Sequence, residues 1–232
     1  MSGERGADGH RDHHPGERMS PSQRRLYWLI RNVIAGACRV WFRVEVVGRK
    51  NVPVHGPFVV APNHRSNLDT PVLAVITSRI LRYMGKDTLW ETKPLGWLLT
   101  ALGGFPVHRG TADREALHAG LACIERGEPL VMFPEGTRQT GPELAEMFDG
   151  PAYVACRTGA PLLPVGMAGT EAAMPKGAKF IRPVKVRIVV GEPINPPPRG
   201  ERGRVSRRAV RDLTAQLGVS VQQLFDEARG DD

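Results

Sequence analysis

Short apolar runs of strand length alternate along the chain with segments of helical periodicity, and this alternation limits the fold more than any other feature of the sequence. Alternating strands and helices predict an α/β fold. We expect a disordered tail at residues 1–22, a helix at 23–44, and one domain at 45–232 with a mostly central mixed sheet flanked by helices. The predicted strands are 44–47, 58–61, 83–85, 104–107, 129–133, 162–167 and 184–190, and the further helices are 71–81, 94–102, 112–126, 152–158 and 205–228.

The first predicted helix, at residues 24–44, is basic on one side and apolar on the other. At about 100° per residue, Asn32 and the arginines, among them Arg31, fall within an arc of about 120°. Tyr27, Trp28 and Trp41 add rings typical of membrane interfaces. Charged residues break the apolar run, so no uninterrupted apolar stretch of the helix is long enough to span a bilayer. We expect it to lie on an anionic membrane surface; the alternative is a helix packed on the core with a solvated basic edge.

The formal net charge of +8 predicts an anionic partner, which could be nucleic acid, a membrane surface or a phosphorylated substrate. No nucleic-acid partner is expected, because the basic residues fall in no recognised nucleic-acid module. The three cysteines are widely separated and indicate a reducing compartment rather than a disulfide framework. The histidines between residues 10 and 14 could hold a metal, but a solvated tail is the simpler interpretation, and no metal is expected.

Residues 63–70 follow a predicted strand and carry the first candidate catalytic group. Strand-to-helix loops are where α/β sheets place ligands. His64 in this loop can take a proton from an alcohol at neutral pH, and Asp69 can fix the tautomer and orientation of its ring. The alternative is that Ser66 caps a helix, Asp69 completes a capping box, and His64 is an ordinary loop residue.

Two further loops offer groups that can bind a phosphate. Residues 133–138 follow a buried strand and supply a flexible turn, a hydroxyl and a guanidinium. The strand at 104–107 leads to Arg109, a second guanidinium for the same phosphate. We expect the three loops to meet, because sites gather at such strand ends. The alternative is that Glu135 only pairs with Arg138 and that Arg109 is a surface charge.

These motifs resemble those of the glycerolipid acyltransferase family that includes the 1-acylglycerol-3-phosphate acyltransferases, over residues 40–195. The family's Phe-Pro-Glu-Gly-Thr-Arg motif is present in full at 133–138, and residues 103–109 and 161–165 match two further motifs. Gln139 departs from the family, which often has serine there, and residues 148–150 lack a common lysine. The Asn-His-x-Ser-x-x-Asp motif is met by Asn63, His64, Ser66 and Asp69.

The resemblance implies transfer of a fatty acyl group from acyl-CoA or acyl-carrier protein to the free hydroxyl of 1-acylglycerol 3-phosphate, which gives phosphatidic acid for phospholipid biosynthesis. His64 is then a general base oriented by Asp69, with no covalent intermediate and no cofactor. The protein is expected on the cytoplasmic face of the cell membrane, peripheral or monotopic. The expected substrate-binding residues are Asn63, Ser66, Arg109, Glu135, Gly136, Thr137 and Arg138.

Other acceptors and one other class of protein stay open. Glycerol 3-phosphate or another lysophospholipid could be the acceptor, and a non-enzymatic lipid-binding protein would keep the pockets without needing the base. The acyl chain needs apolar surroundings, either a tunnel or the membrane. The candidates, which equally suit a core, are Trp90, Leu95, Trp97, Leu98 and Leu99.

Overall fold

The structure is a computed structural model that describes residues 19–107, 114–198 and 204–230. Its centre is a seven-stranded sheet in the order β1-β7-β6-β2-β5-β3-β4. All neighbouring strands are parallel except β6 and β7, so β1 and β7 run against the other five. The strands are β1 Glu45–Val47, β2 Val59–Pro62, β3 Arg82–Lys86, β4 Gly104–Val107, β5 Leu130–Val131, β6 Leu162–Ala168 and β7 Arg187–Val190. The predicted α/β fold with a mixed sheet is confirmed.

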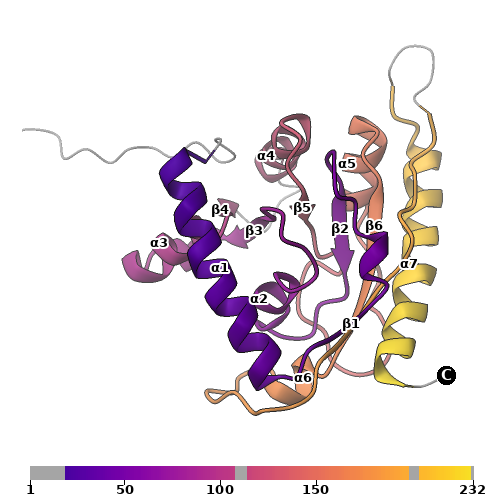
Figure 1. Cartoon of the computed structure of the whole chain (residues 1–232). Helices are drawn as coiled ribbons and strands as arrows, with labels where there is room; N and C mark the ends of the chain where they lie inside the picture. Colours follow the sequence, from indigo (N-terminus) through magenta and orange to yellow (C-terminus); the bar gives the residue numbers. More distant parts are fainter. Residues whose placement is uncertain (1–18, 108–113, 199–203, 231–232) are drawn as a thin grey trace, which may run out of the picture.

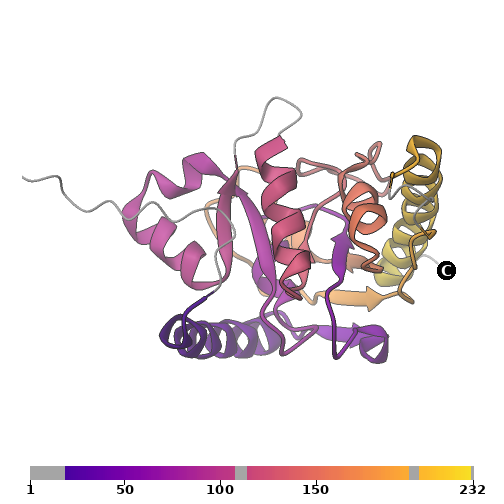
Figure 2. The same cartoon turned by 90° about the horizontal axis from the view of Figure 1, so that it is seen from above.

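Helices cover both faces of this sheet (Figure 1 and Figure 2). One face packs against α1 (Pro21–Trp41) and α2 (Asp69–Leu73), and the other against α4 (Arg114–Glu125), α5 (Gly150–Thr158) and α7 (Arg207–Arg229). Successive residues of β2 alternate between the two apolar cores, because side chains of a strand point alternately to its two faces. The shorter elements are α3 Lys93–Ala101, α6 Thr170–Ala173 and the 3-10 helices η1 Arg49–Asn51 and η2 Asp87–Trp90.

The helix expected at 71–81 is wrong beyond residue 73. α2 begins at Asp69, which makes Pro71 its third residue, and it ends at Leu73. The guanidinium of Arg31 donates hydrogen bonds to the carbonyl oxygens of Ala74 and Thr77. These side-chain donors bind carbonyls that a longer helix would pair with its own amides.

A capping box starts α1 at Pro21, ahead of the predicted position. Ser20 Oγ accepts from the amide of Gln23 at 3.3 Å, and Gln23 Oε1 accepts from the amide of Ser20 at 2.7 Å. Pro21 suits the first helical position because its missing N–H would have no partner there. Within the three described stretches, no helix combines the length and the apolarity that crossing a bilayer requires.

The face of α1 that packs on the protein differs from the expected one. Arg31 belongs to the predicted basic arc, yet it is buried together with Tyr27, Ala35 and Cys38, and its guanidinium binds the segment that follows α2. Several apolar side chains therefore turn outward. Those most exposed on α1 are Leu29 (65%), Val33 (65%), Val40 (81%) and Trp41 (52%).

Candidate active site

His64 and Asp69 meet at the carboxyl end of β2. His64 Nδ1 lies 2.8 Å from Asp69 Oδ2, and both residues are buried. The ring of Phe133 stacks on the imidazole with 4.0 Å between ring centroids, which limits rotation of the imidazole. Nε2 of His64 has no hydrogen-bond partner among the described residues. The histidine therefore has one nitrogen fixed by a carboxylate and the other available to a substrate.

Asp69 is held in place by the backbone of the same loop. Its Oδ2 accepts from the amides of Arg65 at 2.7 Å and Ser66 at 2.8 Å, in addition to the contact with His64. The bond from Ser66 N to Asp69 is the kind that a capping box makes. The capping alternative drawn from the sequence is wrong, because the N-cap of α2 is Leu68, without a side-chain cap bond, and Ser66 Oγ binds Met174 instead. One carboxylate oxygen of Asp69 both closes the turn and contacts the imidazole.

Glu135 connects the third motif to the first one. It is 2% exposed; its Oε1 accepts from the amide of His64 at 2.7 Å, and its Oε2 pairs with Arg65 Nη1 at 2.8 Å. The amide of Ala145 donates to Oε2 as well. Glu135 therefore pairs with Arg65 rather than with Arg138. Both of its carboxylate oxygens already accept hydrogen bonds from the protein. A role in positioning His64 fits this geometry better than the expected substrate contact.

Asn63 and Ser66, two further predicted substrate contacts, also have internal partners. Asn63 spans from β2 to β6, where its amide group donates to and accepts from the backbone of Met167 at 3.0 and 2.7 Å. Ser66 Oγ donates to the carbonyl of Met174 at 2.8 Å. Both residues are fully buried. Their geometry fits the support of the loop that carries His64.

The turn at residues 136–138 carries the remaining predicted substrate-binding residues and lies beside the His64–Asp69 pair, here called the dyad. Gly136 has a φ of 68°, which favours glycine, and the amide of Gln139 donates to the carbonyl of His64 at 2.9 Å. Thr137 is exposed. Arg138 is half-buried and makes no hydrogen bond or ion pair within the described part of the chain. A guanidinium in this state can donate hydrogen bonds to an anionic oxygen.

Arg109 lies outside the described residues, so its predicted role stays a prediction.

The indole ring of Trp90 packs directly on the backbone of Gly85. A Cβ added to Gly85 would come within 2.8 Å of this ring. Its Nε1 donates to Thr100 Oγ1 at 2.9 Å, whereas Trp97 is exposed. Trp90 is thus a packing residue of η2 and α3. Trp97 is available for contact with a lipid.

The sequence interpretation did not single out Arg65. Its guanidinium donates to Glu135 and to the carbonyl of Glu143, and it lies over the ring of Phe225 of α7, 4.9 Å from the centroid. The signal in the sequence that could have revealed this pair is that Arg65 and Glu135 carry opposite charges in two loops that both follow strands.

Among the described residues, no group of His, Cys, Asp and Glu side chains is arranged to hold a metal ion. The tail histidines lie outside those residues.

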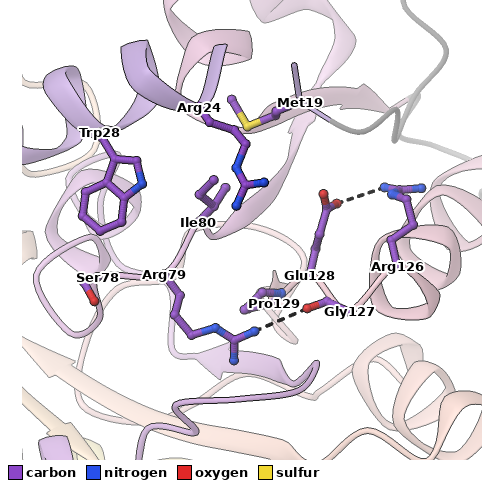
Figure 3. A pocket seen from close by; sticks show the side chains of 10 residues that line it. All are labelled: Met19, Arg24, Trp28, Ser78, Arg79, Ile80, Arg126, Gly127, Glu128 and Pro129. Carbon is purple, nitrogen blue, oxygen red and sulfur yellow. Dashed lines mark hydrogen bonds and ion pairs between the residues drawn. The ribbon is translucent and has the colours of Figure 1, made fainter. Parts of the chain in front are cut away.

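Two cavities differ in their relation to the dyad. A cavity of about 500 Å³ lies where β3 and β5 begin, at the end of the parallel strands opposite to the one that carries His64. Arg24 and Arg79 are among the residues that line it (Figure 3). No residue of the motif loops lines it. A second cavity, of about 570 Å³, is lined by Phe148, whose ring lies against Gly136. The second cavity therefore adjoins the third motif.

The fold and the dyad define an α/β protein equipped for acid–base chemistry at the ends of parallel strands. A model of the Acyltransferase family matches residues 43–168, more than half of the 232 residues. The chain therefore belongs to the Acyltransferase family, as the resemblance of its motifs predicted.

Individual relatives agree with the family. The crystal structure of the 1-acyl-sn-glycerophosphate (LPA) acyltransferase PlsC from Thermotoga maritima matches with a TM-score of 0.70 and 25% identity, over 89% of this chain and 83% of that one. The Pseudomonas aeruginosa lyso-ornithine lipid O-acyltransferase is 28% identical over 94% of this chain and 81% of its own length. The chloroplastic 1-acyl-sn-glycerol-3-phosphate acyltransferase BAT2 of Brassica napus is 26% identical over 66% of this chain. The chain spans about half the length of such plant and algal relatives.

Proposed function

We propose that this protein transfers a fatty acyl group from an acyl thioester of coenzyme A or acyl-carrier protein to the free hydroxyl of 1-acylglycerol 3-phosphate. The observation that carries the proposal is the His64–Asp69 pair, because Nδ1 is fixed at 2.8 Å while Nε2 is free of protein partners among the described residues. The product is phosphatidic acid. The family and the relatives named above support the reaction class.

In the proposed reaction, His64 Nε2 removes the proton of the acceptor hydroxyl while that oxygen attacks the thioester carbonyl carbon. The tetrahedral intermediate collapses when the carbon–sulfur bond breaks, and the leaving thiolate takes the proton from the imidazolium. Asp69 stabilises the imidazolium and preserves its orientation. No acyl-enzyme forms, because the acceptor itself is the nucleophile.

The acceptor phosphate is proposed to bind at the turn of residues 136–138. Arg138 supplies a charged donor, and a guanidinium binds phosphate oxygens through two parallel hydrogen bonds. Thr137 supplies a hydroxyl, and Gly136 keeps the backbone of the turn open. Arg109 is proposed as the second guanidinium. In this scheme Asn63, Ser66 and Glu135 support the loop rather than touch the substrate.

The membrane is proposed as the source of the acceptor lipid, with α1 lying on its cytoplasmic face. The exposed side chains of Leu29, Val33, Val40 and Trp41 support this part of the proposal, since they form an apolar stripe along the helix. Exposed arginines beside the stripe suit anionic headgroups.

A lyso-ornithine lipid is the second candidate acceptor, favoured by the similarity to the Pseudomonas acyltransferase over 94% of this chain. The test is a transfer assay with acyl-CoA donors and several acceptors, read by product mass: 1-acylglycerol 3-phosphate, glycerol 3-phosphate, other lysophospholipids and lyso-ornithine lipid. Preferred acylation of 1-acylglycerol 3-phosphate is expected. Preferred acylation of lyso-ornithine lipid would replace the proposed acceptor, and no transfer to any acceptor would refute the enzymatic function.

A further inference from the structure

Two large apolar side chains stand out from the connection between α6 and β7, here called the 174–183 loop. Phe180 is 83% exposed, and its neighbour Ile181 is 46% exposed. Single exposed apolar residues are common on protein surfaces. Adjacent ones at the tip of a loop are typical of a surface that is covered in the functional state.

The charges around this tip are of one sign. Lys176, Lys179 and Arg182 are exposed and make no side-chain hydrogen bond or ion pair within the described residues. No Asp or Glu occurs from residue 172 to residue 191. Basic side chains beside an aromatic and an aliphatic residue match the interface of an anionic bilayer, where headgroups meet acyl chains.

The backbone holds the tip outward in a closed loop. The amide of Arg182 donates to the carbonyl of Ala173 at 2.9 Å, which brings the two ends of the loop together. Inside it, the amide of Ala178 donates to the carbonyl of Pro175 at 3.0 Å. Between these bonds the residues of the tip have no core to enter, so Phe180 projects away from the protein.

The same loop contacts both the candidate active site and α1. Ser66 of the first motif donates to the carbonyl of Met174 at 2.8 Å, where the loop begins. Arg43, just after α1, donates to the carbonyl of Pro183 at 3.2 Å, where the loop ends. In Figure 1 the loop passes beneath the C-terminal end of α1. The loop is therefore anchored beside the C-terminal end of α1 and on the side of the sheet that carries the first motif.

We propose that the 174–183 loop is a second membrane-binding site, which inserts Phe180 and Ile181 into an anionic bilayer while Lys176, Lys179 and Arg182 contact lipid phosphates. With α1, it fixes the side of the protein that carries His64 against the lipid surface. A protein partner fits less well, because the loop is anchored beside the C-terminal end of α1 and carries only positive charge. The inference rests on the proposed function only in that the acceptor lipid comes from the same bilayer.

Insertion can be measured at the tip itself. The full-length Phe180→Cys variant is labelled with an environment-sensitive fluorophore; Cys38, Cys123 and Cys156 are buried, and burial raises the pKa of each thiol, so they react slowly. Val219→Cys is the matched control, because Val219 is 60% exposed on α7, on the opposite side of the protein from α1 (Figure 1). Each labelled protein is mixed with phosphatidylglycerol vesicles and with phosphatidylcholine vesicles.

The proposal predicts a blue shift and a rise of emission at position 180 with phosphatidylglycerol vesicles, a smaller response with phosphatidylcholine, and none at position 219. An unchanged spectrum at position 180 in protein that sediments with the vesicles would overturn the proposal, and so would the absence of any sedimentation. An equal response at both positions would show that insertion is not specific to the loop, which also overturns it.

A second variant connects insertion with catalysis. Phe180→Ser with Lys179→Glu is expected to lower the vesicle-bound fraction by about tenfold, since it removes apolar area and reverses a charge. Transfer to an acceptor in vesicles should fall more than transfer to a short-chain acceptor dissolved as monomers. Equal losses would contradict the proposal. If the unaltered protein transfers to neither acceptor, the proposed function fails, while the fluorescence result at position 180 still stands.

Discussion

Arg65 of the first motif and Glu135 of the third motif form an ion pair in which both side chains are almost completely buried, with 2.8 Å between Nη1 and Oε2. The same carboxylate accepts from the amide of His64. One buried interaction therefore fixes two strand ends relative to each other and sets the position of the candidate base. This explains how two motifs that lie 70 residues apart in sequence are held side by side.

Removing one partner of this pair should destabilise the protein. Arg65→Met leaves a buried carboxylate without its cation, and a loss of about 3 kcal/mol in the free energy of unfolding is expected, measured by urea denaturation. Arg208→Met is the control, because Arg208 pairs with Asp212 on the exposed side of α7. If Arg65→Met is no more destabilising than the control, the buried pair does not hold the loops together.

Asp69→Asn tests the orientation of the imidazole. The amide keeps the size of the side chain but removes the charge that stabilises the imidazolium, so kcat is expected to fall by about 10²–10⁴-fold. The acceptor KM should change little, because Asp69 is buried and touches no substrate in the proposed scheme. Steady-state kinetics check both values, with Asp212→Asn as the control. A kcat within a factor of about two of the unaltered protein would contradict the role of Asp69.

Arg138→Gln tests the phosphate site. Loss of a hydrogen bond to a charged group costs about 1.5–3 kcal/mol, so the KM for 1-acylglycerol 3-phosphate is expected to rise by roughly 10- to 100-fold. Transfer to a monoacylglycerol, which has no phosphate, should respond little. Equal effects on the two acceptors would mean that Arg138 does not bind the phosphate.

Val33→Ser together with Val40→Ser tests the apolar stripe of α1. Both side chains are exposed, so the fold should tolerate the change, while sedimentation with anionic vesicles is expected to decrease. Val219→Ser on α7 is a matched exposed control. Sedimentation equal to that of the control variant would remove α1 from the membrane-binding surface.

Periodicity was sufficient to predict the order of the strands and of the longer helices, since strands such as β2 and β6 are short, apolar and bounded by turns, but it missed α6 and the 3-10 helices η1 and η2. It failed where tertiary contacts decide local structure. The segment after Leu73 leaves the helix because Arg31 binds its carbonyls, and no local pattern reveals a donor located on another helix. The same contact places Arg31 on the packed face, whereas the other residues of the predicted basic arc are exposed.

Some contacts of the candidate site could be predicted from the sequence, and others could not. The pairing of His64 with Asp69 follows from five-residue spacing in a loop, and the structure brings the two together. The bonds of Asn63 to Met167 and of Glu135 to Arg65 did not follow, because these partners lie 70 or more residues away in sequence. Residue type alone does not tell a buried polar group that supports a loop from one that touches a ligand.

The central claim is that His64 is the base for acyl transfer, and it is tested most directly by the His64→Ala variant. Product mass is measured with acyl-CoA and 1-acylglycerol 3-phosphate, alongside circular dichroism and vesicle sedimentation. The account predicts that transfer falls by about 10²-fold or more while the spectrum and vesicle binding are unchanged. Transfer at an undiminished rate by a folded His64→Ala protein would contradict it.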